Sequence, residues 1–131
     1  RSRTSSNVKY TVEIPENSTI IVPMCIPLIE WVVENIVKNA IDAMQGKGSI
    51  TLRLINSGKN AVIEISDTGK GIPKRNFKTV FKPGYTTKKH GWGLGLSLAQ
   101  RIINDYHKGD IIVKSSEPGK GTTFKITLPK K

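Results

Sequence analysis

The chain has 131 residues, of which 37% are hydrophobic and 24% are charged, a balance that suits one globular domain and excludes a wholly disordered chain. Its single cysteine, Cys25, excludes an internal disulfide and a cysteine-rich zinc site. No apolar run reaches the roughly 18 residues that a membrane helix needs. Because the chain opens with Arg1 and carries neither an initiator methionine nor a signal peptide, we expect residues 1–131 to be a single domain of a longer protein.

The formal net charge of +11 indicates an anionic partner, such as phosphates, a nucleic acid, an acidic lipid or an acidic protein. Residues 70–90 hold seven of the 21 basic residues and no acidic residue. This stretch is either a solvated loop or a surface that contacts an anion, and charge alone leaves both interpretations open. The seven residues are Lys70, Lys74, Arg75, Lys78, Lys82, Lys88 and Lys89.

An alternation of apolar and polar residues predicts a half-buried strand over residues 8–14, with Val8, Tyr10, Val12 and Ile14 on its buried face. A short strand is predicted over residues 19–22. After Pro27, apolar residues recur every three or four positions, which predicts a buried helix over residues 28–45 that ends before two glycines. Residues 50–54 and 61–66 read as the strands of a hairpin.

Residues 72–92 show no period and are predicted to form a long loop, a feature that in compact domains is usually functional or mobile. A second helix is predicted over residues 94–107, followed by a hairpin of residues 110–115 and 122–128. The order of strand, helix, hairpin, loop, helix and hairpin favours an α/β two-layer sandwich, in which helices pack on one face of a mixed sheet.

Asn35, Asn39 and Asp42 stand at i, i+4 and i+7, so they form one line along the first predicted helix, beside its apolar stripe. Asparagine has a poor helix propensity, so two of them here need a reason. They are either hydrated polar residues or an edge that binds metal and phosphate, since an amide oxygen is a hard, neutral ligand that suits Mg²⁺.

Asp67 ends a predicted buried strand and begins the run Asp67-Thr68-Gly69-Lys70-Gly71. An Asp-x-Gly run is often only a turn. A buried carboxylate here could instead accept a hydrogen bond from an exocyclic amine such as that of adenine, and the glycines would let a flat ring approach the backbone.

The run Gly91-Trp92-Gly93-Leu94-Gly95-Leu96 opens the second predicted helix, where free N–H groups and the positive end of the helix dipole suit a phosphate. No strand directly precedes this run, as a Rossmann motif requires, and no Gly-Lys-Ser/Thr completes a Walker loop. Neither of these nucleotide-binding folds is predicted.

Five motifs follow one another over residues 28–128: Asn35-Ile36-Val37-Lys38-Asn39-Ala40, Asp67-Thr68-Gly69-Lys70-Gly71-Ile72, Phe77-Lys78-Thr79-Val80-Phe81, Gly91-Trp92-Gly93-Leu94-Gly95-Leu96 and Gly121-Thr122-Thr123-Phe124. Their order and spacing resemble the ATP-binding catalytic domain of sensor histidine kinases, in the GHKL superfamily. The resemblance implies a Bergerat-type fold: a two-layer sandwich with a mixed, mainly antiparallel sheet and a long ATP lid, here at about residues 73–92.

The resemblance also implies ATP and Mg²⁺ as ligands. Asn39 would hold the metal, Asp67 would bind the adenine amino group, and Phe77 and Phe81 would anchor the lid. The implied ATP-binding residues are Asn35, Lys38, Asn39, Asp42, Asp67, Gly69, Gly71, Ile72, Lys82, Thr87, Lys88, Gly91, Gly93, Leu94, Gly95, Leu96 and Thr122.

In the family, a threonine of the last strand binds in the adenine pocket. Thr122 shares its face with Phe124 and Ile126 whereas Thr123 points the other way, so the alternation selects Thr122. ATPases of the superfamily carry a catalytic glutamate four residues before the metal asparagine, and this position is Asn35 here. Glu34 should point elsewhere, because one residue turns a helix by about 100°. A phosphotransferase is therefore favoured over an ATPase.

The implied activity is that of the catalytic half of an ATP-dependent histidine kinase, which donates the γ-phosphate to a histidine on a separate dimerisation domain. That phosphoacceptor domain, and a response regulator downstream, would be the partners. No catalytic residue is assigned in the chain, since His90 and His107 are expected to have surface or structural roles. We expect a cytoplasmic, monomeric domain that binds no nucleic acid. Two alternatives stay open: a nucleotide sensor without catalysis, and a basic domain that binds nucleic acid.

Overall fold

The computed structural model describes residues 7–14, 24–82 and 95–130. A five-stranded sheet with the strand order β1-β2-β3-β5-β4 forms one layer. β1 pairs with β2 in parallel, and the other neighbours are antiparallel. The mixed, mainly antiparallel sheet is confirmed. Its strands are β1 (Asn7–Glu13), β2 (Lys47–Ser57), β3 (Asn60–Asp67), β4 (Asp110–Glu117) and β5 (Gly121–Pro129).

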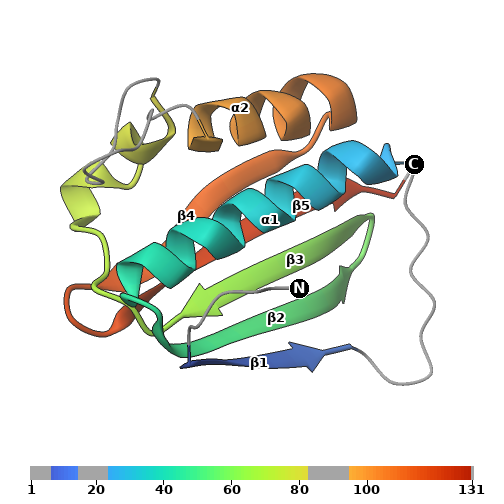
Figure 1. Ribbon diagram of the computed structural model, residues 1–131. Coiled ribbons are helices and arrows are strands. Elements are labelled where there is room, and N and C mark those ends of the chain that lie inside the picture. Colours follow the sequence, from blue (N-terminus) through green and yellow to red (C-terminus); the bar gives the residue numbers. More distant parts are fainter. Residues whose placement is uncertain (1–6, 15–23, 83–94, 131) are drawn as a thin grey trace.

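Helices form the second layer and cover one face of the sheet (Figure 1). They are α1 (Ile26–Ala43) and α2 (Gly95–Arg101), which continues as a π-helical turn, η3 (Ile102–Tyr106). Two 3₁₀ helices, η1 (Lys74–Asn76) and η2 (Thr79–Phe81), stand within the segment that the sequence analysis assigned to a loop. None of the described helices has the length and apolarity that crossing a bilayer requires. The two-layer α/β prediction is confirmed.

The core lies between α1 and the sheet. Apolar residues of α1 spaced three and four apart, Ile29, Val32, Ile36 and Ala40, bury one face of the helix. Across from them, β3 and β5 contribute the alternate residues that the period-two pattern predicts, Ile65, Phe124, Ile126 and Leu128. The position of α1 is thereby fixed over the centre of the sheet.

The predicted burial of the first strand is wrong for three of its four apolar residues, since only Val8 packs, partly buried, against the core. The strand forms, but the side chains of Tyr10, Val12 and Ile14 are 56%, 63% and 64% exposed. β1 is one of the two edge strands of the sheet, and among the described elements only β2 packs extensively against it. Alternation along a strand therefore predicted the strand correctly, but it carries no information on whether the strand is central or at the edge. The strand predicted over residues 19–22 lies outside the described residues.

His107 ties the two helical elements together, which agrees with the structural role expected for it. The ring is buried; Nε2 accepts a hydrogen bond from the Cys25 N–H at 3.0 Å, and Nδ1 donates to the carbonyl of Ile102 at 3.0 Å. Cys25 is the residue that precedes α1, so this contact holds the start of α1 against the end of η3. His90 lies outside the described residues.

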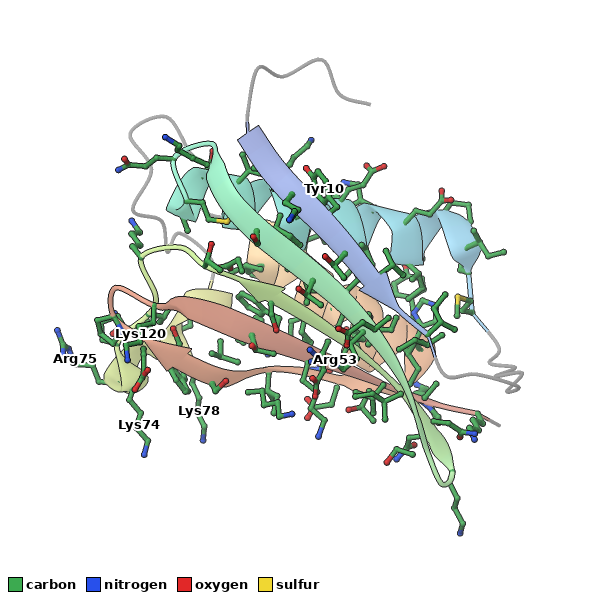
Figure 2. All side chains as sticks on the ribbon, turned by 90° about the horizontal axis from the view of Figure 1, so that it is seen from below. Tyr10, Arg53, Lys74, Arg75, Lys78 and Lys120 are labelled. Atoms are coloured by element: carbon green, nitrogen blue, oxygen red, sulfur yellow. The ribbon has the colours of Figure 1, made fainter. Side chains whose placement is uncertain are left out.

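Charged side chains cross the opposite face of the sheet from strand to strand. The Glu64 carboxylate on β3 accepts hydrogen bonds from Arg53 of β2 at 2.9 Å and from Lys114 of β4 at 2.6 Å. Arg53 also donates to Glu13 of β1 at 2.8 Å. Burial by itself would raise the pKa of Glu64, but the two hydrogen-bonded cations outweigh it and hold this pKa below its usual value. Figure 2 shows Arg53 among the side chains of this face.

Candidate functional site

Asp67 stands at the end of β3 and is half-buried. Its Oδ1 accepts two backbone hydrogen bonds, from Gly69 N–H at 2.8 Å and from Thr122 N–H at 3.3 Å. Both bonds within the described residues fall on Oδ1, so Oδ2 is left to accept from a ligand. The carboxylate is thus held in one orientation by the backbone, with one oxygen for recognition.

Burial raises the pKa of the Asp67 carboxyl above its ordinary value, and the hydrogen bonds from Gly69 and Thr122 oppose the rise. Desolvation is the larger of these effects. None of the ion pairs among the described residues includes Asp67. A carboxylate kept partly out of water without such a pair is costly, and such groups are found preferentially at functional sites.

Thr122 lies beside Asp67 and is 6% exposed, whereas Thr123 points to the other face of the sheet and shares a hydrogen bond with Ser66 at 2.8 Å. The two threonines thus point to opposite faces of β5, as the alternation requires, and the role of Thr122 in ATP binding stays a prediction. The Thr122 hydroxyl contacts the Ser116 hydroxyl at 2.8 Å.

Ser116 is a residue of this site that the sequence analysis missed. Its oxygen accepts from the Ile72 N–H at 2.7 Å, and its hydroxyl donates to the carbonyl of Gly121 at 2.9 Å. Since its one proton is used there, the Thr122 hydroxyl must be the donor in the Ser116–Thr122 pair, and Thr122 then faces the site as an acceptor. The sequence offered only one sign of this role, the pair Ser115 and Ser116 that follows the alternating buried residues Ile111 and Val113 of β4.

The segment after Asp67 packs tightly between α1 and the β4–β5 turn. The Lys70 N–H donates to the carbonyl of Ala43 at 3.1 Å, and the Lys70 carbonyl accepts from the Gly119 N–H at 2.7 Å. Gly71 has φ +84°, and a Cβ there would stand 2.3 Å from the carbonyl oxygen of Glu117. Only glycine fits this position, for its backbone angle and for its close approach. Gly69 is buried, and Ile72 packs against the core.

Along α1, Asn35 and Asn39 are half-buried on one edge, and Lys38 and Asp42 are exposed. The Asn35 side-chain nitrogen is buried, yet it meets no hydrogen-bond acceptor among the described residues. Gly95, the first residue of α2, lies directly against it, and a Cβ on Gly95 would stand 2.4 Å from that nitrogen. A buried amide donor without an acceptor is costly, and a phosphate oxygen would relieve the cost.

The donor set along α1 fits Mg²⁺ better than a transition metal. No group of three or more His, Cys, Asp or Glu residues that could hold a metal occurs within residues 7–14, 24–82 and 95–130. Mg²⁺ keeps most of its waters and commonly takes only one or two protein ligands, together with substrate phosphates. The half-buried amide of Asn39 is a hard oxygen ligand of this kind.

The described part of the expected lid is anchored by aromatic side chains. Phe81 is buried, and its ring meets that of Phe124 edge to face, with centroids 6.1 Å apart. Phe77 packs against the core from a partly buried position. Lys82 is exposed at the end of this part, and Leu96 is half-buried on α2. Thr87, Lys88, Gly91, Gly93 and Leu94 lie outside the described residues.

A family model described as histidine kinase-, DNA gyrase B- and HSP90-like ATPase matches residues 26–131. This match covers α1 and the rest of the chain after it, and so includes both the asparagines of α1 and the residues around Asp67. The chain belongs to this family. Because this is a family of ATPase domains, membership implies that the chain binds ATP, as the sequence analysis expected.

Histidine kinases are among the similar proteins. Sporulation kinase C of Bacillus subtilis is 41% identical over 97 residues, which are 74% of this chain and 22% of that protein. The signal transduction histidine-protein kinase AtoS of Escherichia coli is 45% identical over 103 residues, which are 78% of this chain and 17% of that protein. The chain thus spans about a fifth of the length of these relatives.

Solved structures of histidine kinases also resemble the chain. The nucleotide-free catalytic domain of the histidine kinase ThkA superimposes with a TM-score of 0.83 at 31% identity, over 95% of this chain and 81% of that one. ThkA in complex with the response regulator protein TrrA superimposes with a TM-score of 0.79 at 28% identity, over 95% of this chain and 34% of that one. Together with the family match, these structures identify the chain as a histidine kinase ATPase domain of the kind found in two-component sensor kinases.

Proposed function

We propose that this ATPase domain binds Mg·ATP and presents its γ-phosphate to a histidine on a separate phosphoacceptor domain of the same kinase. The observation that carries the proposal is the buried Asn35 amide, which lacks an acceptor among the described residues and faces Gly95. A phosphate chain between α1 and α2 would supply that acceptor. In this proposal residues 1–131 act as one ATP-binding catalytic domain, and the phosphoacceptor histidine is supplied by a separate domain.

The adenine end is assigned to the residues around Asp67. Asp67 Oδ2 would accept from the exocyclic amine of adenine, and the hydroxyl of the neighbouring Thr122 would offer a second acceptor. Guanine carries a carbonyl oxygen where adenine carries this amine, so the pocket would disfavour it. Gly69 and Gly71 would form the backbone wall, because a Cβ at either position would meet the neighbouring backbone, and Ile72 would complete the wall.

The phosphate end is assigned to α1, to the start of α2 and to the lid. Asn39 would hold Mg²⁺, which supplies charge neutralisation when it is bound. Asn35 would donate to a phosphate oxygen from its buried position, and Lys38 and Asp42 would complete the edge. The remaining proposed contacts are Lys82, Gly95 and Leu96, with Thr87, Lys88, Gly91, Gly93 and Leu94 outside the described residues.

The chain's own groups favour transfer to a protein over hydrolysis. Asn35 stands one helical turn before Asn39, and its amide cannot take a proton from an attacking water. What the residues provide is positioning of the phosphates and compensation of their charge, which is most of what phosphoryl transfer asks of a protein. The partners would be the phosphoacceptor domain and then a response regulator, in keeping with the ThkA–TrrA complex. The proposed location is the cytoplasm, because the domain would draw its ATP from there.

The proposal is tested by calorimetric titration with ATP and GTP, with and without Mg²⁺. We expect ATP to bind and GTP to bind at least tenfold more weakly, with Mg²⁺ increasing the ATP affinity. The parent's phosphoacceptor domain, added in trans, should then gain acid-labile phosphohistidine from labelled ATP. Absence of ATP binding in a folded sample would overturn the site; binding without transfer would reduce the domain to a nucleotide sensor.

A further inference from the structure

Four cations from two distant parts of the chain gather at one corner of the molecule, which we call the basic corner: Lys74, Arg75, Lys78 and Lys120. Figure 2 shows them projecting outward at the same end of the domain. The first three come from η1 and the residues after it, and Lys120 comes from the β4–β5 turn. All four side chains are exposed.

The close packing around Gly71 brings these two segments together. The Gly119 N–H donates to the Lys70 carbonyl at 2.7 Å, and Ser116 accepts from the Ile72 N–H at 2.7 Å. These backbone contacts hold the segment that leads into η1 against the β4–β5 turn. Backbone hydrogen bonds therefore hold the two segments of the basic corner next to each other in the folded chain.

The charges of the basic corner are barely compensated within the described residues. Lys120 approaches Glu117 at 3.8 Å, but both side chains are more than 70% exposed, and such a pair contributes little. None of the ion pairs among residues 7–14, 24–82 and 95–130 includes Lys74, Arg75 or Lys78. Unpaired like charges that are held together repel one another, and an anionic partner would relieve that repulsion.

We propose that the basic corner docks a carboxylate-rich surface of a partner protein. The inference rests on the proposed function in one respect: a domain that passes a phosphate to proteins must face a protein at the rim of its nucleotide site. The basic corner lies at that rim, because the segment from Gly69 to Ile72 both contacts the Asp67 carboxylate and leads into η1. A protein with clustered Asp and Glu residues complements it.

A nucleic acid fits the basic corner less well. None of the exposed large apolar or aromatic side chains among the described residues falls within residues 70–82 or 116–121, so the surface offers no ring on which a base could stack. The cations also form one compact group and not a stripe along which a phosphate backbone could run. Short, clustered carboxylates match this arrangement.

The test uses a fluorescein-labelled peptide of twelve alternating Asp and Glu residues, with an Asn/Gln peptide as the neutral probe. Anisotropy is measured on the chain, on the variant K74E/R75E/K78E and on the matched variant K9E/K47E/K59E. Both variants lower the formal net charge by six, from +11 to +5, through exposed side chains. We expect the first variant to lose at least tenfold in affinity for the acidic peptide and the matched variant to lose less than threefold.

Equal losses in the two variants would overturn the proposal, since binding would then follow total charge alone. Tighter binding of a random 30-base-pair DNA duplex than of the acidic peptide, lost in the same variant, would also overturn it in favour of nucleic acid. The milder K74Q/R75Q/K78Q variant repeats the comparison if the charge reversals impair folding. ATP titration of every variant keeps the two proposals apart, because a failed nucleotide site would remove ATP binding without changing the peptide result.

Discussion

The backbone N–H of Thr122 donates to Asp67 Oδ1 across 3.3 Å, although the two residues lie 55 positions apart in the chain. This bond ties the end of β3 to the start of β5. It orients the carboxylate and places the Thr122 hydroxyl beside it. The proposed adenine site therefore depends on the pairing of β3 with β5. Single substitutions at the site can test it.

Replacement of Asp67 by Asn should weaken ATP binding at least tenfold, or by about 1.4 kcal/mol or more, because the amide can present a donor to the adenine amine. The same change should raise Tm at pH 7. Burial raises the pKa of Asp67, so the ionised form destabilises the fold. The stability that this raised pKa provides is complete below about pH 3.9 and is lost as pH rises through the folded-state pKa.

Calorimetry and thermal melts between pH 3 and pH 8 measure both effects. The Tm advantage of Asp67→Asn over the original chain should shrink toward acid pH. The exposed Asp110→Asn serves as the matched control. An unchanged ATP affinity in Asp67→Asn would refute the adenine assignment.

Replacement of Asn39 by Ala should remove most of the Mg²⁺ dependence of ATP binding, because the proposed hard oxygen ligand is lost. The measurement is ATP affinity in Mg²⁺ and in EDTA, expressed as a ratio. The ratio should approach one in the variant and stay well above one in Asn104→Ala, which changes an exposed asparagine away from the site. Retention of the full ratio in Asn39→Ala would count against the metal assignment.

Replacement of Gly95 by Ala should reduce Mg·ATP affinity about tenfold with little change in stability. The new Cβ would stand 2.4 Å from the Asn35 side-chain nitrogen, so the amide must move from its buried position. The helix itself gains up to about 1 kcal/mol from the change of glycine to alanine, which offsets the displacement. Leu98→Ala, at a 43% exposed position of the same helix, should bind as the original chain does. Unaltered affinity in Gly95→Ala would separate Asn35 from the nucleotide site.

Replacement of Ser116 by Ala should destabilise the fold by roughly 1–3 kcal/mol and also weaken ATP binding, since Ile72 and Thr122 both lose their partner. Urea unfolding gives the first quantity and calorimetry the second. The adjacent Ser115 is exposed, so Ser115→Ala is the matched control. A stability loss without any loss of ATP affinity would limit Ser116 to a structural role.

Replacement of Glu64 by Gln should destabilise the fold at pH 7 by about 1 kcal/mol, a modest figure because Arg53 and Lys114 are 38% and 50% exposed and solvent screens them. The pKa of Glu64 is lowered in the folded state, so its contribution is present above about pH 4.3 and is lost as pH falls through the folded-state pKa. Urea unfolding of both proteins at several pH values should show their difference closing toward pH 3. A difference that persists at pH 3, or one equal to that of the exposed Glu30→Gln, would contradict this account.

The amino-acid pattern alone determined most of the secondary-structure elements. The candidate site residues came from five motifs and the family that they resemble, and their roles in ATP binding stay predictions. Apolar periods of 3.6 and two placed α1 and the strands close to their observed bounds, since periodicity reports which face of an element meets the core. The alternation of β5 also distinguished Thr122 from Thr123, because the choice depends on one strand only.

Tertiary structure decided what depends on contacts between elements. Tyr10 and Val12 are exposed because β1 lies at a sheet edge where, among the described elements, only β2 packs extensively against it. Ser116 lies near Asp67 because β4 meets the segment that follows Asp67. Lys120 joins the basic corner only because the chain around Gly71 packs on the β4–β5 turn. A sequence pattern records the local environment of each residue, whereas these contacts join residues that are tens of positions apart.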